Sequence, residues 1–73
     1  MTFGEKAVGL SFNPSGDDLV HKIKKLYAEI IDLVGAERNG PPSEKGWLLS
    51  IAITEAQSAQ MWAVKAVTWK DFP

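Results

Sequence analysis

The feature that most constrains the fold is a long segment near the end of the chain, residues 44–70, whose apolar side chains point in nearly every direction. Alanines recur along it at steps of four, three, four and three residues, the spacing of one seam along an α-helix: Ala52, Ala56, Ala59, Ala63 and Ala66. Larger apolar residues flank this seam: Leu48, Leu49, Ile51, Ile53, Met61, Trp62, Val64, Val67 and Trp69. A helix that is apolar nearly all round is expected to be buried all round, so one partner helix cannot cover it.

The remainder of the chain offers few partners for such a helix. With 73 residues, no cysteine and a single histidine, the chain has a small core and neither a disulfide framework nor the usual zinc patterns. Association of copies is then the available stabilising device. We expect a homo-oligomer, with the alanine seam, Trp62 and Trp69 at subunit contacts. The alternative is that the tryptophans pack only within the chain, against its first helix.

A second helical pattern occupies residues 17–35. Its apolar positions recur at steps of three and four residues: Leu19, Ile23, Leu26, Ile30 and Leu33, with Val20, Tyr27, Ile31 and Val34 beside them. The opposite face carries charges that predict a solvated surface: Lys22, Lys25, Glu29 and Asp32. Ser15 or Asp17 is predicted to cap this helix at its start, and Gly35 to end it.

The segments outside these two helices contain turn-forming residues. Residues 1–16 show no helical period, and "SFNPSG" predicts a turn within this arm. Residues 36–43 form a loop that contains "NGPP", after which Ser43 is predicted to cap the second helix. The sequence thus predicts one all-α domain over residues 1–73, an antiparallel two-helix hairpin with a short N-terminal arm.

The residues expected of an enzyme or a metalloprotein are missing from the sequence. No Ser/His/Asp set, cysteine nucleophile or metal-ligand cluster occurs, so neither catalysis nor a cofactor nor a metal is expected. Eight Lys and Arg against nine Asp and Glu argue against binding of duplex nucleic acid. No segment has the length and apolarity of a membrane span, and "MTFGEKAVGL" is too charged for a signal peptide. We expect a protein of the cytoplasm.

The densest positive run, "HKIKK" at residues 21–25, has two interpretations. Such a run is commonly a solvated face, with His21 at the surface. However, Phe12 and Tyr27 lie on either side of it in sequence, and the turn at residues 13–16 offers backbone amides beside a helix N-terminus, where anions are favoured. Lysine, aromatic rings and amides together suit a small phosphorylated nucleotide.

The chain also resembles a known family. The stretch "AITEAQSAQMWAVKAVT" is similar to the second-helix motif of small phage proteins that sequester cyclic nucleotides, the anti-CBASS and Thoeris anti-defence sponges. Met61-Trp62-Ala63, followed by Lys65 and Ala66, is the centre of the likeness. Phe12-x-Pro14 resembles the family's aromatic turn, and "VHKIKKLYAEIIDLV" its first helix. The likeness covers most of the chain.

The resemblance implies a homohexamer in the cytoplasm of an infected bacterial host. It implies that cyclic dinucleotides bind between protomers, near the aromatic turn and the first helix. In some members, a separate pocket where three protomers meet holds cyclic trinucleotides. Such sponges bind these signals without cleaving them and thereby block anti-phage signalling.

The resemblance also implies roles for individual residues. Phe12 would stack on a base, with Asn13, Pro14 and Tyr27 nearby, and Lys24 would meet phosphate or base. Lys65 would belong to the trinucleotide pocket. The chain departs from the family in having phenylalanine where tyrosine is common, which removes a hydroxyl. It also lacks the insertions of some Thoeris-directed relatives, which makes a ligand of the cyclic ADP-ribose type less expected.

Two functions therefore follow from the sequence. The first is a non-catalytic sponge for cyclic nucleotides, leaving open the choice among cGAMP, cyclic di-GMP, cyclic tri-adenylate and rings derived from ADP-ribose. The second is a structural or protein-interaction hairpin whose apolar helix docks on a host or phage protein. Uptake of intact cyclic nucleotide by the purified protein discriminates between them.

Overall fold

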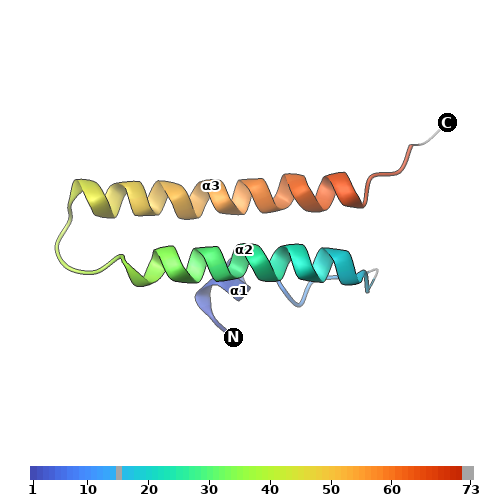
Figure 1. Ribbon diagram of the computed structural model, residues 1–73, viewed down its shortest axis with the longest axis horizontal. Helices are drawn as coiled ribbons and strands as arrows, with labels where there is room; N and C mark the ends of the chain where they lie inside the picture. The colour runs from blue at the N-terminus through green and yellow to red at the C-terminus, as the bar shows by residue number, and fades with distance from the viewer. Residues whose placement is uncertain (15, 72–73) are drawn as a thin grey trace.

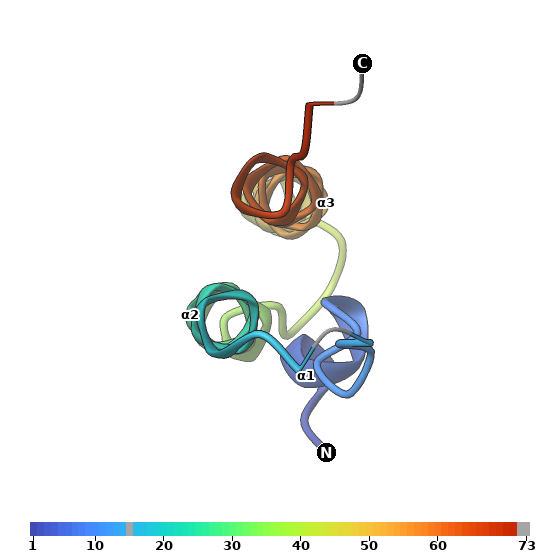
Figure 2. The same cartoon turned by 90° about the vertical axis from the view of Figure 1, so that its right-hand side faces the viewer.

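The protein is an α-helical hairpin with an additional short helix packed on one side (Figure 1). The computed structural model describes residues 1–14 and 16–71, which form α1 (Phe3–Ala7), α2 (Asp18–Ala36) and α3 (Glu44–Val67). Helices α2 and α3 run antiparallel side by side, and α1 lies against α2 (Figure 2). The all-α prediction is confirmed. Within the described part of the chain, no helix has the length and apolarity needed to cross a membrane.

Helix α1 was not expected, because the arm at residues 1–16 shows no helical period. Five residues are too few to display one, but the start of this helix carries a capping box. The Thr2 hydroxyl accepts a hydrogen bond of 3.0 Å from the Glu5 amide, and the Glu5 carboxylate accepts one of 2.8 Å from the Thr2 amide. The prediction of an irregular arm is therefore wrong for residues 3–7.

Helix α1 docks on the face of α2 that was predicted to be solvated. The Gly4 amide donates a hydrogen bond to Asp32, and the Lys25 ammonium forms a 2.7 Å ion pair with Glu5. Lys25 and Asp32 thus bind a neighbouring helix, whereas Lys22 and Glu29 of the same face are exposed. These polar contacts act together with apolar ones, since Ala7 of α1 packs against the buried core and Val8, its C-cap, belongs to that core.

The start of α2 lies where the sequence predicts it, but its end does not. Asp17 caps the helix through its carboxylate, which accepts hydrogen bonds from the Leu19 and Val20 amides, and the other candidate, Ser15, lies outside the described residues. Gly35 does not end the helix. The helix continues to Ala36, and the C-cap Glu37 keeps a right-handed helical backbone, so no left-handed glycine is needed.

The core of the hairpin lies beside the predicted apolar stripe of α2, not on it. Four buried residues drawn from the arm, α2 and α3 form this core: Val8, Ala28, Ile31 and Ile53. The stripe residues Leu19, Leu26, Ile30 and Leu33 are exposed, so the prediction that this stripe faces the core is wrong for the single chain. Gly4 lets α1 approach the α2 backbone at Ala28 closely, because a Cβ at Gly4 would clash with the Ala28 carbonyl oxygen.

Helix α3 begins as predicted and ends earlier. Ser43 is the N-cap and accepts a hydrogen bond of 3.0 Å from the Gly46 amide. The helix stops at Val67, with Thr68 as C-cap, and the Thr68 hydroxyl donates a hydrogen bond of 2.7 Å to the Val64 carbonyl. Residues 69–70 therefore lie beyond the helix, contrary to the prediction.

Most of the apolar surface of α3 is uncovered. Ala56 packs against the core, but Ala52, Ala59 and Ala66 are exposed. Trp62 and Trp69 are 68% and 64% exposed, so the alternative that the tryptophans pack against the first helix is wrong. The chain measures 52 × 26 × 13 Å, and a slab so thin leaves one side of each long helix without a neighbour.

Candidate functional site

The segment between α1 and α2 is a tightly hydrogen-bonded turn. The Phe12 amide donates to the Gly9 carbonyl at 2.9 Å, where Gly9 has a φ of 63° that favours glycine. The Asn13 side chain donates to the Asp17 carbonyl at 2.9 Å and accepts from the Asp17 amide at 3.3 Å. Because Asp17 also caps α2, the turn and the start of α2 form one unit.

A buried lysine anchors this turn from beneath. Lys24 is only 5% exposed, and its Nζ donates hydrogen bonds to the Gly9 carbonyl at 3.0 Å and to the Phe12 carbonyl. The same Nζ lies 5.6 Å from the centre of the Phe12 ring, within the range of a cation–π interaction. Phe12 is 73% exposed, so its backbone is held by hydrogen bonds while the residue remains open to solvent.

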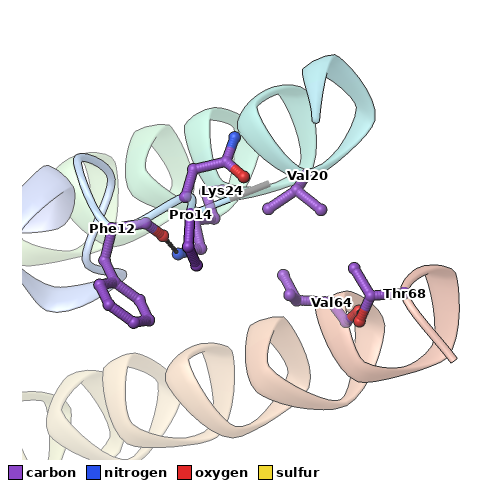
Figure 3. Close-up of a pocket in the computed structure, with 7 residues that line it drawn as sticks. Phe12, Pro14, Val20, Lys24, Val64 and Thr68 are labelled. Carbon is purple, nitrogen blue, oxygen red and sulfur yellow. Dashed lines mark hydrogen bonds between the residues drawn. The ribbon is translucent and has the colours of Figure 1, made fainter. Parts of the chain in front are cut away.

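A hollow of about 320 Å³ lies between this turn and the last turns of α3 (Figure 3). Seven residues line it: Phe12, Asn13, Pro14, Val20, Lys24, Val64 and Thr68. Apolar walls with a few polar groups are typical of small-molecule sites, whose volumes are about 300–1,000 Å³. The hollow is at the small end of that range, so it has room for part of a dinucleotide.

Four of the predicted ligand-binding residues come together around this hollow. They are Phe12, Asn13, Pro14 and Lys24, which join from the turn and from α2. Sequence reasoning missed Val20, Val64 and Thr68. The antiparallel order of the hairpin could have indicated them, because it brings the end of α3 beside the start of α2.

The other two predicted ligand-binding residues lie elsewhere. Tyr27 packs against the core cluster and does not line the hollow. Lys65 lies on a different face of α3, where it lines a second hollow together with Ser58, Met61 and Trp62. The Lys65 Nζ is 5.3 Å from the centre of the Trp62 ring, within the range of a cation–π interaction.

The positive run at residues 21–25 is divided by the fold among three environments. His21 and Lys22 are exposed, as the solvated-face interpretation predicts, whereas Lys24 is buried. Lys25 pairs with Glu5, and its hydrogen bond, together with one from the Thr2 amide, lowers the pKa of Glu5 from 4.5 to about 2. The same ion pair raises the pKa of Lys25. The run therefore does not act as one anion-binding patch.

A protein-family model matches most of the chain. The family model described as "Acb2/Tad1, hairpin domain" matches residues 5–68. The matched range extends from the last part of α1 to the C-cap of α3 and includes both hollows. No curated protein and no solved structure matches the chain.

Proposed function

Because the chain belongs to the Acb2/Tad1 hairpin family, which its match over residues 5–68 shows, we propose that it sequesters cyclic oligonucleotide second messengers. In this role it binds the signals of a bacterial anti-phage system without cleaving them. It acts in the cytoplasm of an infected host. Sequestration needs only affinity and enough copies, and a preformed pocket loses little entropy on binding.

The observation that carries the proposal is the placement of the Phe12 ring. The ring is exposed at the edge of a hollow, and the turn that holds it is fixed by hydrogen bonds to α2. An exposed ring on a rigid backbone is a stacking platform, and every nucleobase has a face to offer it. Asn13 and Thr68 add polar side chains to the wall of the same hollow.

One chain supplies only part of the site in this proposal. The hollow is about 320 Å³, and it opens between helices whose outer faces are exposed and apolar. A neighbouring copy would cover those faces and close the site around a cyclic dinucleotide. We propose a homohexamer, the assembly that the family resemblance implies, with the alanine seam and Trp62 at subunit contacts that cover the exposed apolar surface of α3.

The second hollow is proposed as a separate site for cyclic trinucleotides. Lys65 and Trp62 place a cation beside an aromatic face, which suits a ligand with phosphates and bases. Both residues are exposed in the single chain, so several copies meeting there would bring several lysines together. This site is independent of Phe12, since the two hollows share no lining residue.

The test is uptake and release of intact ligand. The purified protein is titrated by calorimetry with cGAMP, cyclic di-GMP, cyclic tri-adenylate and cyclic ADP-ribose, with a linear dinucleotide as the control. Heat denaturation should then release the bound ring unchanged, as chromatography of the supernatant would show. Binding to none of the cyclic ligands would contradict the sponge function and favour the protein-interaction hairpin. Release of a cleaved product would contradict the absence of catalysis.

A further inference from the structure

We infer that Lys24 is a positioning residue, which fixes the Phe12 ring for stacking and does not itself neutralise a ligand phosphate. The effect on ligand binding rests on the proposed function. The claim that Lys24 holds the Phe12 turn can be tested without any ligand. It assigns to Lys24 a role different from the phosphate or base contact that the resemblance implies.

The first support is the set of partners that Lys24 already has. An ammonium group has three N–H donors. Two of them are taken by the Gly9 and Phe12 carbonyls, and the Phe12 ring lies 5.6 Å away. A phosphate that pulled this Nζ away would remove the lysine donor from the Phe12 carbonyl and leave the Gly9 carbonyl with the Phe12 amide alone, and losing such hydrogen bonds is unfavourable. Two of the three donors are thus committed to the turn, and a phosphate would have to compete with the two carbonyls for them.

The second support is the burial of the side chain. Lys24 is 5% exposed, whereas Lys22, one half-turn earlier on the same helix, is exposed to solvent. A group that meets phosphate from solution is expected at the surface, as Lys22 is. Lys24 instead donates to the carbonyls at the two ends of the segment 9–12, which are 15 residues (Gly9) and 12 residues (Phe12) away in sequence.

The third support is that the hydrogen bonds of Lys24 restrain the backbone that carries the Phe12 ring. The Gly9 carbonyl accepts both from Lys24 and from the Phe12 amide, so one atom joins the lysine to the backbone that carries the ring. The Phe12 carbonyl is held by the same Nζ. With both carbonyls fixed, the ring of Phe12 keeps its position at the edge of the hollow (Figure 3). Its entropy loss on stacking is correspondingly reduced.

A ligand-free experiment tests the structural part. Lys24→Met keeps an unbranched side chain and removes the donors, while Lys22→Met removes the same charge from an exposed position of α2. Amide hydrogen exchange is measured by NMR on the unliganded protein. In Lys24→Met, exchange at Phe12 should accelerate on the order of tenfold or more, with exchange at Ile31 in the core unchanged. Unchanged exchange at Phe12 would overturn the inference.

A binding experiment then separates positioning from phosphate contact. The affinity for a cyclic dinucleotide is measured at several salt concentrations. Loss of one aromatic stack should weaken binding on the order of tenfold to a hundredfold in Lys24→Met. The salt dependence should stay that of the parent, because no charge contact to the ligand is lost. A reduced salt dependence in Lys24→Met, beyond any in Lys22→Met, would overturn the inference.

A double-mutant cycle with Phe12 completes the test. If Lys24 acts through the ring, Lys24→Met should cost little further affinity in the Phe12→Ala background. Additive losses would show that Lys24 binds the ligand on its own and would overturn the inference. If the parent binds no cyclic nucleotide, the proposed function fails instead, and the hydrogen-exchange comparison still decides whether Lys24 holds the turn.

Discussion

The Gly4 amide donates a hydrogen bond of 2.7 Å to the Asp32 carboxylate, joining α1 to α2 across 28 residues of sequence. The approach is so close that only glycine fits. A Cβ atom at this position would lie 2.1 Å from the Ala28 carbonyl oxygen and 2.8 Å from the Asp32 Oδ1 atom. Helix α1 leads directly into the turn that carries Phe12, so this contact fixes the entry to the candidate site.

Gly4→Ala should therefore displace α1. Because backbone cannot yield as a flexible side chain does, we expect a loss of about 1–3 kcal/mol in the free energy of unfolding, the usual range for overpacking. Gly35→Ala is the matched control. A Cβ there meets nothing within 4 Å, so this change should stabilise the helix by about 0.5–1 kcal/mol. Urea denaturation of the two variants measures both effects, and equal stability of Gly4→Ala and the parent would contradict the packing described.

The Glu5–Lys25 ion pair should make stability depend on acid. The hydrogen bond from Lys25 lowers the pKa of Glu5 from 4.5 to about 2, so folding favours the charged carboxylate. The contribution of the Glu5 carboxylate to the free energy of unfolding is complete above about pH 4.5. It is lost as the pH falls from there through the folded-state pKa of about 2. Glu5→Gln should flatten the decline in stability between these values, as urea denaturation at a series of pH values would show. Glu55→Gln, an exposed glutamate of α3, should leave the decline as in the parent.

The alanine seam gives a prediction about assembly. Ala59 is exposed in the single chain, so Ala59→Leu should leave the fold of the hairpin intact. At a close contact between copies it should overpack the seam, at about 1–3 kcal/mol per site. Ala63→Leu should act in the same direction. Analytical ultracentrifugation should show smaller species for both variants, and an unchanged oligomer for Ala36→Leu at the exposed end of α2. A parent that is a stable monomer at micromolar concentration would contradict the proposed oligomer.

Phe12 gives the most direct prediction for ligand binding. Phe12→Ala should remove about 1–3 kcal/mol per stacked base from the binding of a cyclic dinucleotide, and Phe12→Tyr should preserve it. Phe3→Ala is the control, because Phe3 is also an exposed ring but lies in α1 outside the hollow. Calorimetric titration of the three variants measures the differences. If Phe12→Ala binds as tightly as Phe3→Ala, the dinucleotide site lies elsewhere.

Lys65 gives a prediction that separates the two hollows. Lys65→Ala removes the cation over Trp62 and should weaken binding of a cyclic trinucleotide, while dinucleotide binding stays as in the parent. Lys45→Ala is the control, since it removes a positive charge from the same helix in an exposed ion pair with Glu37. Parallel titrations with both ligand classes check this. A loss of dinucleotide affinity in Lys65→Ala alone would contradict the independence of the two sites.

Local features were readable from the sequence because they depend on residues within about one helical turn of each other. Asp17 and Ser43 were predicted as caps, and both accept amide hydrogen bonds from residues two or three positions ahead. The capping box of Thr2 and Glu5 is equally local and was available in the sequence. The apolar period does not reveal it, because a five-residue helix is too short to show one. The prediction that Gly35 ends α2 is wrong, because the sequence alone does not distinguish a glycine inside a helix from one at its end.

The composition of the site was readable only in part. The turn residues Phe12, Asn13 and Pro14 follow from sequence, whereas Val64 and Thr68 enter the hollow only through the pairing of α2 with α3. Tyr27 was predicted at the site but does not line the hollow. It lies close to the positive run in sequence, yet its position on α2 turns it into the core.

The sequence by itself determined that the chain is all-α, where its two long helices begin, and which family it belongs to. Those properties rest on short-range hydrogen bonds and on residue order. Only the tertiary structure decided which face of α2 is covered, that Leu19 and Leu33 stay exposed, and that Lys24 is buried under the turn. Burial depends on which backbones can approach each other, and here Gly4 and Ala28 permit a contact between segments far apart in sequence. That contact cannot be read from the period of either helix alone.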